Sequence, residues 1–399
     1  MYASRLDKWI KIAVAGAALA FGASSVTVLA HAAPIPPGVF ETKAKHAILM
    51  DADANFVLFA KDADTLAPPA SLSKLMTLAV VFRELKAGHL KLEDQFKVSE
   101  HAWRTGGAPS GGAAMFAPLN SMVSISDLIQ GITVQSGNDA AIILAEGIAG
   151  SEDAFAKQMT DYARTIGLEK STFVNATGLP AEGHLMSVRE LAILARYLIY
   201  IYPEYYHFFG EPEFTYNKHT FRNRNPLIAM NIGVDGLKTG FIKEAGYGLV
   251  ASAKRGDQRL LLVVGGLDSA KAREAESAKL LEWGFKSFKP FRLFDQGQKV
   301  SEALVWGGTQ HYVPLVGSGD IKIILPSTAT GKVTASIVYN GPIKAPIRKG
   351  DQVAVLRVTS AESQATNDIP LYAGDDIDQS NFAMRGLDSL LVLAFGWLL

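Results

Sequence analysis

The sequence predicts an α+β domain, a small all-β sandwich domain after it, and an amphipathic helix at the C-terminus. Three observations support this order. Both ends of residues 33–288 have the short alternating pattern of strands, and apolar residues in the middle recur at helical spacing. After Phe288 only short strand-like runs follow, until residues 379–399 return to a helical pattern.

The α+β domain is predicted over residues 33–288. Residues 45–50 and 55–61 are expected to form one hairpin, and residues 247–253 and 260–266 a second one. Because the two hairpins are expected to join the same sheet and the helical segments lie between them, we expect a helical cluster packed against an antiparallel sheet.

The sandwich domain is predicted over residues 289–378. Its signals are alternating runs at residues 321–325, 332–339 and 352–358, separated by Gly, Pro, Ser and Asp. It contains no group of catalytic residue types, so any chemistry is expected in the first domain.

The start of the chain has the pattern of a signal peptide. Basic residues precede an apolar run over residues 12–29, and the small-residue sequence A-H-A at residues 30–32 suits a cleavage site. We therefore expect residues 1–32 to be removed, with Ala33 as the first mature residue. An uncleaved membrane anchor is the alternative, because the run is close to spanning length. Either interpretation predicts export.

The end of the chain, residues 379–399, is predicted to be an amphipathic membrane-anchor helix. Arg385 and Asp388 lie on one helical face, and large apolar residues such as Leu391 lie on another. The continuous apolar stretch is too short for ~30 Å of hydrocarbon, so we expect the helix to lie in the membrane surface. A helix docked on the protein itself is the alternative. The preceding residues 374–380 are acidic and are predicted to be a linker.

Composition excludes several classes of function. Lys plus Arg and Asp plus Glu number 39 each among 399 residues, which gives no electrostatic case for nucleic-acid binding. Cysteine is absent, so disulfides and a thiol nucleophile are excluded. The eight histidines, His184 among them, have no metal-ligand spacing. We therefore predict no metal and no cofactor.

The tetrapeptide S-L-S-K at residues 71–74 is the first of three motifs that together indicate an activated serine. On a helix beginning near Pro69, Ser71 and Lys74 project from one face within contact range. The Lys74 amine can take the Ser71 proton if burial or neighbouring cations lower its pKa. If Ser71 lies in the first turn of the helix, the positive end of the helix dipole favours the negative charge that develops on its oxygen. For an isolated motif, an N-cap serine and a solvated lysine are the more common interpretation.

The second motif is S-G-N at residues 136–138, between apolar segments at residues 128–134 and 140–148. Ser136 could relay a proton and Asn138 could bind an amide, while a helix N-cap is the alternative.

The third motif is K-T-G at residues 238–240, in a segment predicted to be an edge strand. An extended peptide can pair with a free edge. Lys238 would supply charge, Thr239 a hydroxyl and Gly240 room for close approach. An ordinary sheet turn is the alternative for an isolated K-T-G.

These motifs and the residues around them resemble the low-molecular-mass penicillin-binding proteins that act as D-alanyl-D-alanine carboxypeptidases. The resemblance covers nearly the whole chain. It implies a fold of the penicillin-binding and serine β-lactamase type for the first domain. The strings that carry it are residues 69–77, 135–140, 234–240, 245–247 and 273–277.

The resemblance implies that Ser71 attacks the penultimate D-alanine of a peptidoglycan stem pentapeptide and releases the terminal D-alanine. Lys74 would be the base, Lys238 and Ser136 proton-relay candidates, and Asn138 the group that holds the substrate amide. Backbone N–H groups of Ser71 and Phe241 would form the oxyanion hole. Penicillins and other β-lactams would acylate the same serine.

The substrate's terminal carboxylate needs a cationic partner, and a guanidinium with a nearby hydroxyl suits it. Arg224 matches the family's arginine for this role, with Thr239 as its partner and Arg222 as a competing neighbour. Arg273 matches another family arginine near the K-T-G strand, but a surface ion pair with Glu274 or Glu276 is the alternative.

Two residues depart from the family pattern. Many relatives carry histidine at the position of Phe241, so we expect effects on deacylation, pH profile and substrate preference. Glu190 stands where relatives often have aspartate, and we expect a structural role. The glycine-bracketed stretch at residues 106–112 corresponds to a family segment that borders the cleft.

Other functions compatible with the motifs are a DD-endopeptidase, a serine β-lactamase, and a non-catalytic penicillin-binding sensor or wall-organising protein. No deacylating glutamate can be assigned, which disfavours the β-lactamase. We expect a periplasmic protein, anchored peripherally to the outer leaflet of the inner membrane, with the sandwich domain as a spacer. Docking to peptidoglycan or to protein is the alternative role of that domain.

Overall fold

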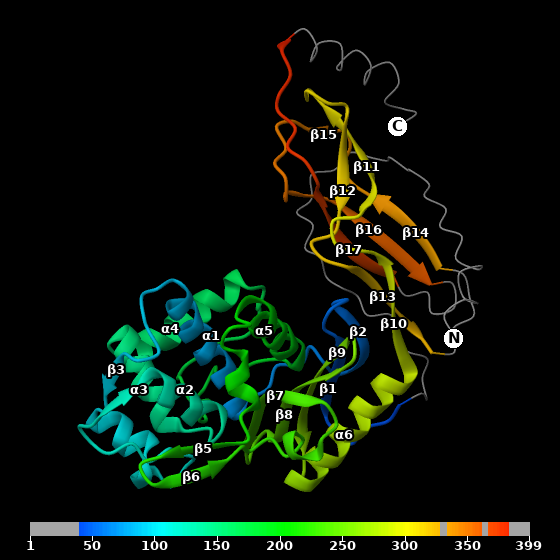
Figure 1. Ribbon diagram of the computed structural model, residues 1–399. Coiled ribbons are helices and arrows are strands. Elements are labelled where there is room, and N and C mark those ends of the chain that lie inside the picture. Colours follow the sequence, from blue (N-terminus) through cyan, green and yellow to red (C-terminus); the bar gives the residue numbers. More distant parts are fainter. Residues whose placement is uncertain (1–39, 328–332, 361–365, 383–399) are drawn as a thin grey trace. The chain divides into compact units, whose positions relative to one another are not determined.

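The computed structural model describes residues 40–327, 333–360 and 366–382. The chain divides into two compact units, one made mainly of residues 37–285 and the other mainly of residues from 286 onward (Figure 1). The first is α+β and the second all-β, so the predicted fold class is confirmed for both.

The first unit contains a five-stranded sheet in the order β2-β1-β9-β8-β7. The pairs β1 with β9, β9 with β8, and β8 with β7 are antiparallel. Both predicted hairpins therefore join one sheet, and the strand that carries K-T-G lies at its edge, as predicted. The strands are β1 (His46–Asp51), β2 (Phe56–Lys61), β7 (Val234–Ile242), β8 (Gly246–Arg255) and β9 (Gln258–Leu267).

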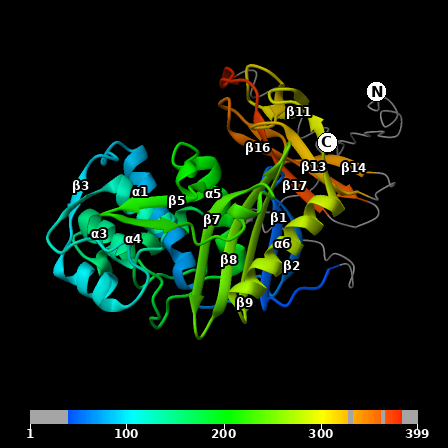
Figure 2. The same ribbon diagram turned by 60° about the horizontal axis from the view of Figure 1, so that its bottom comes forward.

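Helices cover both faces of this sheet. Ile48 and Met50 of β1 belong to the core shared with the helical cluster, whereas Leu49 contacts the position of Gly284 in α6. This alternation is the period of two expected for a strand that is buried on both faces. Figure 2 shows α6 lying along the sheet, apart from the helical cluster. The helices are α1 (Lys74–Lys86), α2 (Ile125–Thr133), α3 (Asn138–Ala149), α4 (Glu152–Thr165), α5 (Val188–Ile201) and α6 (Ala270–Ser287).

Short elements complete the first unit. Two small antiparallel ladders join β3 with β4 and β5 with β6. Their strands are β3 (Gln95–Lys97), β4 (Met122–Ser124), β5 (Glu213–Tyr216) and β6 (His219–Arg222). A π-helical turn covers Ala102–Gly106, and 3₁₀ turns cover Ala70–Ser73, Ala108–Ser110, Tyr206–Gly210 and Ile228–Met230.

The helix predicted to begin near Pro69 is the first correction. Its first four residues form the 3₁₀ turn Ala70–Ser73, and α1 begins only at Lys74. Ala70 has a φ of 51°, which the right-handed α-helix does not allow. Ser71 therefore lies in a tight turn that precedes α1. At its other end α1 stops at Lys86, and Gly88 follows with a φ of 75°.

The second unit is all-β. A six-stranded sheet has the order β14-β16-β17-β12-β11-β15, and β10 pairs with β13 in a two-stranded sheet. Side chains from both sheets form one apolar core. The strands are β10 (Phe288–Phe294), β11 (Lys299–Trp306), β12 (Tyr312–Val316), β13 (Ile321–Pro326), β14 (Val333–Val338), β15 (Ile343–Lys344), β16 (Gln352–Ser360) and β17 (Thr366–Ala373).

The segment 374–380 is the second correction, because it packs on this unit instead of forming a linker. Ile377 is fully buried, and its N–H and C=O both pair with Ile347 at 2.9 Å. The Ser380 N–H donates to the Gly307 carbonyl at 2.8 Å. The acidic composition predicted a linker, but the single apolar residue Ile377 anchors the segment.

The predicted signal peptide and almost all of the predicted C-terminal helix lie outside the described residues. Among the residues that are described, no helix is both long enough and apolar enough to span a bilayer.

Candidate active site

Ser71 and Lys74 are in contact, as their spacing predicts. The Ser71 turn leads directly into α1, and Lys74 Nζ lies 3.1 Å from Ser71 Oγ. Lys74 is fully buried, and its amine also donates to Asn138 Oδ1 at 2.7 Å and to the Thr177 carbonyl at 2.6 Å. The first two motifs therefore meet at one nitrogen atom. A solvated lysine, the alternative interpretation, is excluded.

The surroundings of Lys74 favour the neutral amine. Burial, followed by the positive charge of Arg224, lowers the pKa of Lys74 to about 7, while Asp139 and Glu152 act in the opposite direction. A neutral amine has two N–H groups and one lone pair. When the N–H groups donate to Asn138 and Thr177, the lone pair is left for the Ser71 hydroxyl. Lys74 can thus accept the serine proton near neutral pH without a histidine.

The second motif forms the turn between α2 and α3. Ser136 has a φ of 65° and is buried, and Asn138 is the first residue of α3. The N-cap of α3 is Gly137, so the alternative of Asn138 as an N-cap is wrong. The relay role of Ser136 stays a prediction.

The third motif lies on the edge strand β7. Lys238 is almost completely buried, and its amine donates to the Thr239 carbonyl at 3.1 Å. Burial, and then the charges of Lys74, Arg224 and Arg273, lower the pKa of Lys238 well below its ordinary value. The positive charges of Arg224 and Arg273 act at this position, and they favour the binding of an anion.

Gly240 lets β7 approach the Ser71 turn. A Cβ atom at Gly240 would lie 2.9 Å from Leu72 Cγ and 3.2 Å from the Pro69 carbonyl oxygen. The glycine thus allows the serine turn itself to approach β7, whereas the predicted close approach of a bound peptide stays a prediction.

The two candidate arginines reach the site from different elements. Arg224 is exposed and follows β6, and its Nε donates to Gln135 Oε1 at 3.3 Å. The amide nitrogen of Gln135 donates in turn to the Ala114 carbonyl at 3.2 Å. Gln135 thus orients Arg224, a role that the sequence did not suggest. Arg222, the competing neighbour, lies on β6 with an exposed side chain.

Arg273 lies near the third motif. Its guanidinium carbon is 5.7 Å from the ring centroid of Tyr247, and Arg224 is one of the charges that lower its pKa. Glu276, one alternative partner, instead accepts hydrogen bonds from Thr42 and from the Lys43 N–H. The surface ion pair with Glu276 is therefore wrong.

A loop between α4 and α5 supplies the acceptor that sequence reasoning missed. The Thr177 carbonyl is aimed at Lys74 because Asn175 Oδ1 accepts the N–H groups of Thr177 at 3.1 Å and Gly178 at 2.7 Å. The string N-A-T-G signals a turn, but no sequence signal shows where a main-chain carbonyl will point.

Glu190 and His184 have structural roles, as expected. The Glu190 carboxylate accepts the N–H groups of Lys170 and Ser171. His184 is buried, and its Nδ1 accepts the Val174 N–H at 3.2 Å.

Gly178→Ala is expected to disrupt the site. A Cβ at Gly178 would lie 1.9 Å from the Ala70 carbonyl oxygen, and the residue has a φ of +78°. We expect a loss of about 3 kcal/mol or more in unfolding free energy. The rate of acylation by penicillin should fall as well, because Thr177 is displaced. Gly183→Ala is the matched control, since its φ is +80° and nothing lies within 4 Å. Thermal unfolding of both variants measures the difference, and equal losses would contradict the close contact.

The glycine-bracketed stretch lies beside the second motif, in agreement with its family counterpart. A Cβ at Gly112 would be 3.1 Å from Asn138 Nδ2, and one at Gly106 would be 2.6 Å from the Asp139 nitrogen. The buried Asp139 carboxylate accepts the N–H groups of Met115 at 2.9 Å and Ala117 at 3.2 Å. Asp139 therefore holds the residues that follow this stretch against the start of α3.

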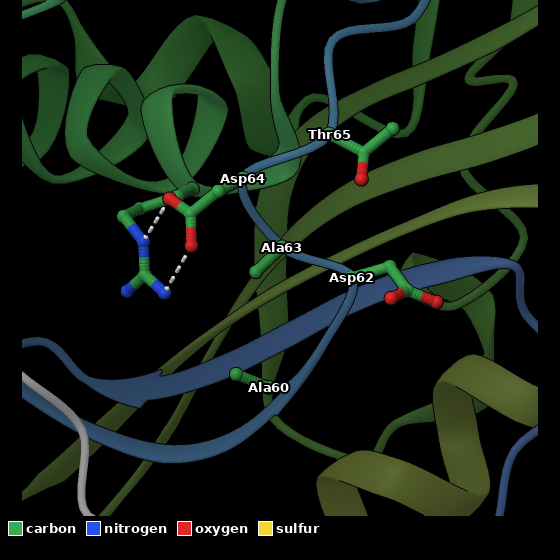
Figure 3. A pocket seen from close by; sticks show the side chains of 6 residues that line it. Ala60, Asp62, Ala63, Asp64 and Thr65 are labelled. Atoms are coloured by element: carbon green, nitrogen blue, oxygen red, sulfur yellow. Dashed lines mark hydrogen bonds and ion pairs between the residues drawn. The ribbon is translucent and has the colours of Figure 1, made fainter.

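A separate depression on the first unit contains none of these residues (Figure 3). Arg189 pairs there with both oxygens of Asp64, at 2.7 and 3.0 Å. Figure 3 shows that this ion pair lies at one side of the depression. It is an exposed surface feature, and the chemistry belongs to the Ser71 site.

Known proteins share this arrangement. Residues 30–269 match the family described as D-alanyl-D-alanine carboxypeptidase, and residues 288–379 match the penicillin-binding protein 5 C-terminal domain. The chain is 36% identical to D-alanyl-D-alanine carboxypeptidase DacA of Escherichia coli K12, over 90% of each chain. It is 38% identical to DacC of the same strain, over 88% of each chain.

A solved structure agrees with these matches. Penicillin-binding protein 5 of Haemophilus influenzae superposes with a TM-score of 0.75 at 35% identity, covering 85% of this chain and 99% of that one. The match extends over the α+β unit that contains Ser71 and over the all-β unit. The chain therefore belongs to the D-alanyl-D-alanine carboxypeptidase family of low-molecular-mass, serine-type penicillin-binding proteins.

Proposed function

We propose that this chain removes the terminal D-alanine from peptidoglycan stem pentapeptides through an acyl-enzyme on Ser71. The observation that carries the proposal is the environment of Lys74, whose buried amine contacts Ser71 Oγ and is held by two acceptors. This geometry gives the serine a base at neutral pH.

Each step uses a group that is already described. The Ser71 proton passes to neutral Lys74 while Oγ attacks the carbonyl carbon of the penultimate D-alanine. The N–H groups of Ser71 and Phe241 receive the oxyanion. The C–N bond then breaks, and the terminal D-alanine leaves with a proton that Lys238 and Ser136 help to deliver. Water cleaves the acyl ester, which frees the shortened peptide and restores Ser71.

Recognition of a free carboxylate favours a carboxypeptidase over an endopeptidase. Arg224, oriented by Gln135, offers an exposed guanidinium to the substrate carboxylate, and Thr239 adds a hydroxyl. A D-alanyl-D-alanine endopeptidase of Escherichia coli K12 is only 29% identical and covers 59% of this chain.

The same serine is proposed to be acylated by β-lactams. Penicillin-binding protein D2 of Listeria monocytogenes, solved with bound cefotaxime, is 31% identical to this chain with a TM-score of 0.56. It covers 62% of this chain and 99% of its own length.

The test of the function is D-alanine release from a stem pentapeptide by the purified chain, beside a crosslinked peptide dimer without a free terminal D-alanine. Release from the pentapeptide alone is expected. Cleavage of the dimer alone would favour the endopeptidase, and labelling by penicillin without any turnover would favour the sensor.

We also infer export and peripheral anchoring to the outer leaflet of the inner membrane. The support is the signal-peptide pattern at residues 1–32 and the amphipathic pattern at residues 379–399.

Removal of residues 382–399 should free the enzyme from membranes, because this segment carries the apolar face predicted to bind them. Turnover of soluble pentapeptide should change less than ~2-fold, since the proposed site lies wholly in the first unit. The measurement is co-sedimentation of the full and shortened chains with inner-membrane vesicles. Unchanged sedimentation would contradict the anchor.

A further inference from the structure

Phe241 presents an exposed aromatic ring at the proposed oxyanion position. It lies on the edge strand β7 and is 50% exposed. The ring stacks on Tyr247, its direct partner on β8, with centroids 4.2 Å apart and an interplanar angle of 30°. The guanidinium of Arg273 lies over the Tyr247 ring. Because β8 supports one side of the Phe241 ring, its exposed side is available to a peptide on the free edge of β7.

The two faces of β7 differ at this point. Cβ atoms at Gly240 and Gly248 would meet Leu72, at 2.9 and 3.2 Å, so these positions face the turn that carries Ser71. Side chains alternate between the faces of a strand. Phe241 and Tyr247 therefore project from the opposite face, where Arg273 of α6 lies.

The register of a bound peptide follows from the oxyanion position. If the N–H of Phe241 donates a hydrogen bond to the oxyanion, this N–H points to the free edge of β7. The carbonyl of Phe241 points the same way, because a residue in an antiparallel ladder exchanges both of its hydrogen bonds with one partner. The penultimate residue of an extended peptide is therefore the direct partner of Phe241.

Configuration decides where the side chain of that partner goes. Two L residues that lie directly opposite each other place their Cβ atoms on the same face, about 5 Å apart. An L side chain at the penultimate position would thus point at the exposed ring of Phe241. A D residue exchanges its side chain with its Cα hydrogen, so its methyl group points to the face of Gly240 and Phe241 meets only the hydrogen.

We propose that Phe241 is a stereochemical selector, which closes one face of β7 to an L side chain at the penultimate position of the substrate. The inference rests on the proposed function, because the register depends on the oxyanion position. It assigns to Phe241 a specificity role that its backbone N–H alone does not have.

The experiment compares two pentapeptides that differ only in the configuration of the penultimate alanine. The value of kcat/KM for release of the terminal D-alanine is measured with the full chain and with the variants F241A, F241T, F241L and Y312A. F241A and F241T remove the ring, and F241L keeps a branched side chain on the same face. Y312A is the matched control, because Tyr312 is 53% exposed on β12 of the other unit.

The ratio of the two kcat/KM values, D over L, is the readout. We expect it to fall ~10-fold or more in F241A and F241T, to stay within ~3-fold of the original in F241L, and to be unchanged in Y312A. An unchanged ratio in both ring-free variants would overturn the selector. Absence of release from the D peptide by the original chain would instead overturn the proposed function, so the two failures are distinguishable.

Discussion

Ser71→Ala is expected to lower D-alanine release by a factor of ~10⁴ or more and to abolish covalent labelling by penicillin. The reason is chemical: alanine offers no oxygen to form the acyl bond, while Lys74 keeps its hydrogen bonds to Asn138 and Thr177. Folding should be preserved, because the substitution removes the hydrogen bond between Oγ and Nζ and leaves those two in place. Mass spectrometry of the penicillin-treated protein and a D-alanine assay measure the two effects.

Ser73→Ala is the matched control for this substitution. Ser73 belongs to the same turn, and its buried hydroxyl has no hydrogen-bond partner among the described residues. Its removal should leave labelling intact. Normal labelling of the Ser71→Ala protein, or loss of labelling with Ser73→Ala, would show that the nucleophile is assigned wrongly.

Lys74→Ala is expected to slow acylation ~10³-fold or more, because the serine loses its base. In the unaltered chain the rate should depend on pH in a defined direction. The pKa of Lys74 is lowered to about 7, so the amine is protonated below this pH and cannot accept the serine proton. The rate of acylation should therefore rise with pH through a midpoint near 7. Stopped-flow measurement with a chromogenic cephalosporin gives this profile.

Arg224→Gln tests the cause of that midpoint. The charge of Arg224 helps to lower the pKa of Lys74, so its removal should raise the pKa and move the midpoint to higher pH. Lys86→Gln is the control, because Lys86 lies at the end of α1 and donates to the Ile201 carbonyl. A midpoint that stays in place in Arg224→Gln would contradict the electrostatic contribution, and a profile without any rise near pH 7 would contradict Lys74 as the base.

Much of the fold was predictable because its signals are local. The alternation at residues 45–50 marks β1, and the apolar spacing at residues 75–85 marks α1. In the second unit the runs named from the sequence match β13, β14 and β16. The other five strands in the described part of this unit were not named, and β10 shows one reason. Its sequence F-K-P-F-R-L-F contains Pro290. Proline is tolerated on edge strands but argues against a central strand, and the sequence alone does not show that β10 lies at an edge.

The side chains of the site were predictable, whereas the backbone around them was not. Motif spacing indicates that Lys74 reaches Ser71, since the two residues lie three positions apart in a helical turn. The carbonyl of Thr177 reaches Lys74 from 103 residues away, and any residue type could supply it. The sequence showed Gln135 only as part of the string at residues 135–140 that resembles the family. Its hydrogen bond to Arg224 could not be predicted, because this bond also depends on long-range folding. The 3₁₀ turn at Ser71 begins at Ala70, which has a positive φ. Alanine rarely has a positive φ, so nothing in the sequence predicted this turn.

The contact between Gly178 and Ala70 has a consequence for redesign of the enzyme. The turn that carries the nucleophile and the loop that holds its base lie so close at Gly178 that a Cβ atom there would be 1.9 Å from the Ala70 carbonyl oxygen and 2.6 Å from Ser73 Oγ. A mutagenesis library should therefore leave Gly178 unchanged, because any side chain at this position would collide with the serine turn. Phe241, on an exposed strand edge with open space beside it, is where new substrate preferences can be selected while the machinery beneath it keeps its shape.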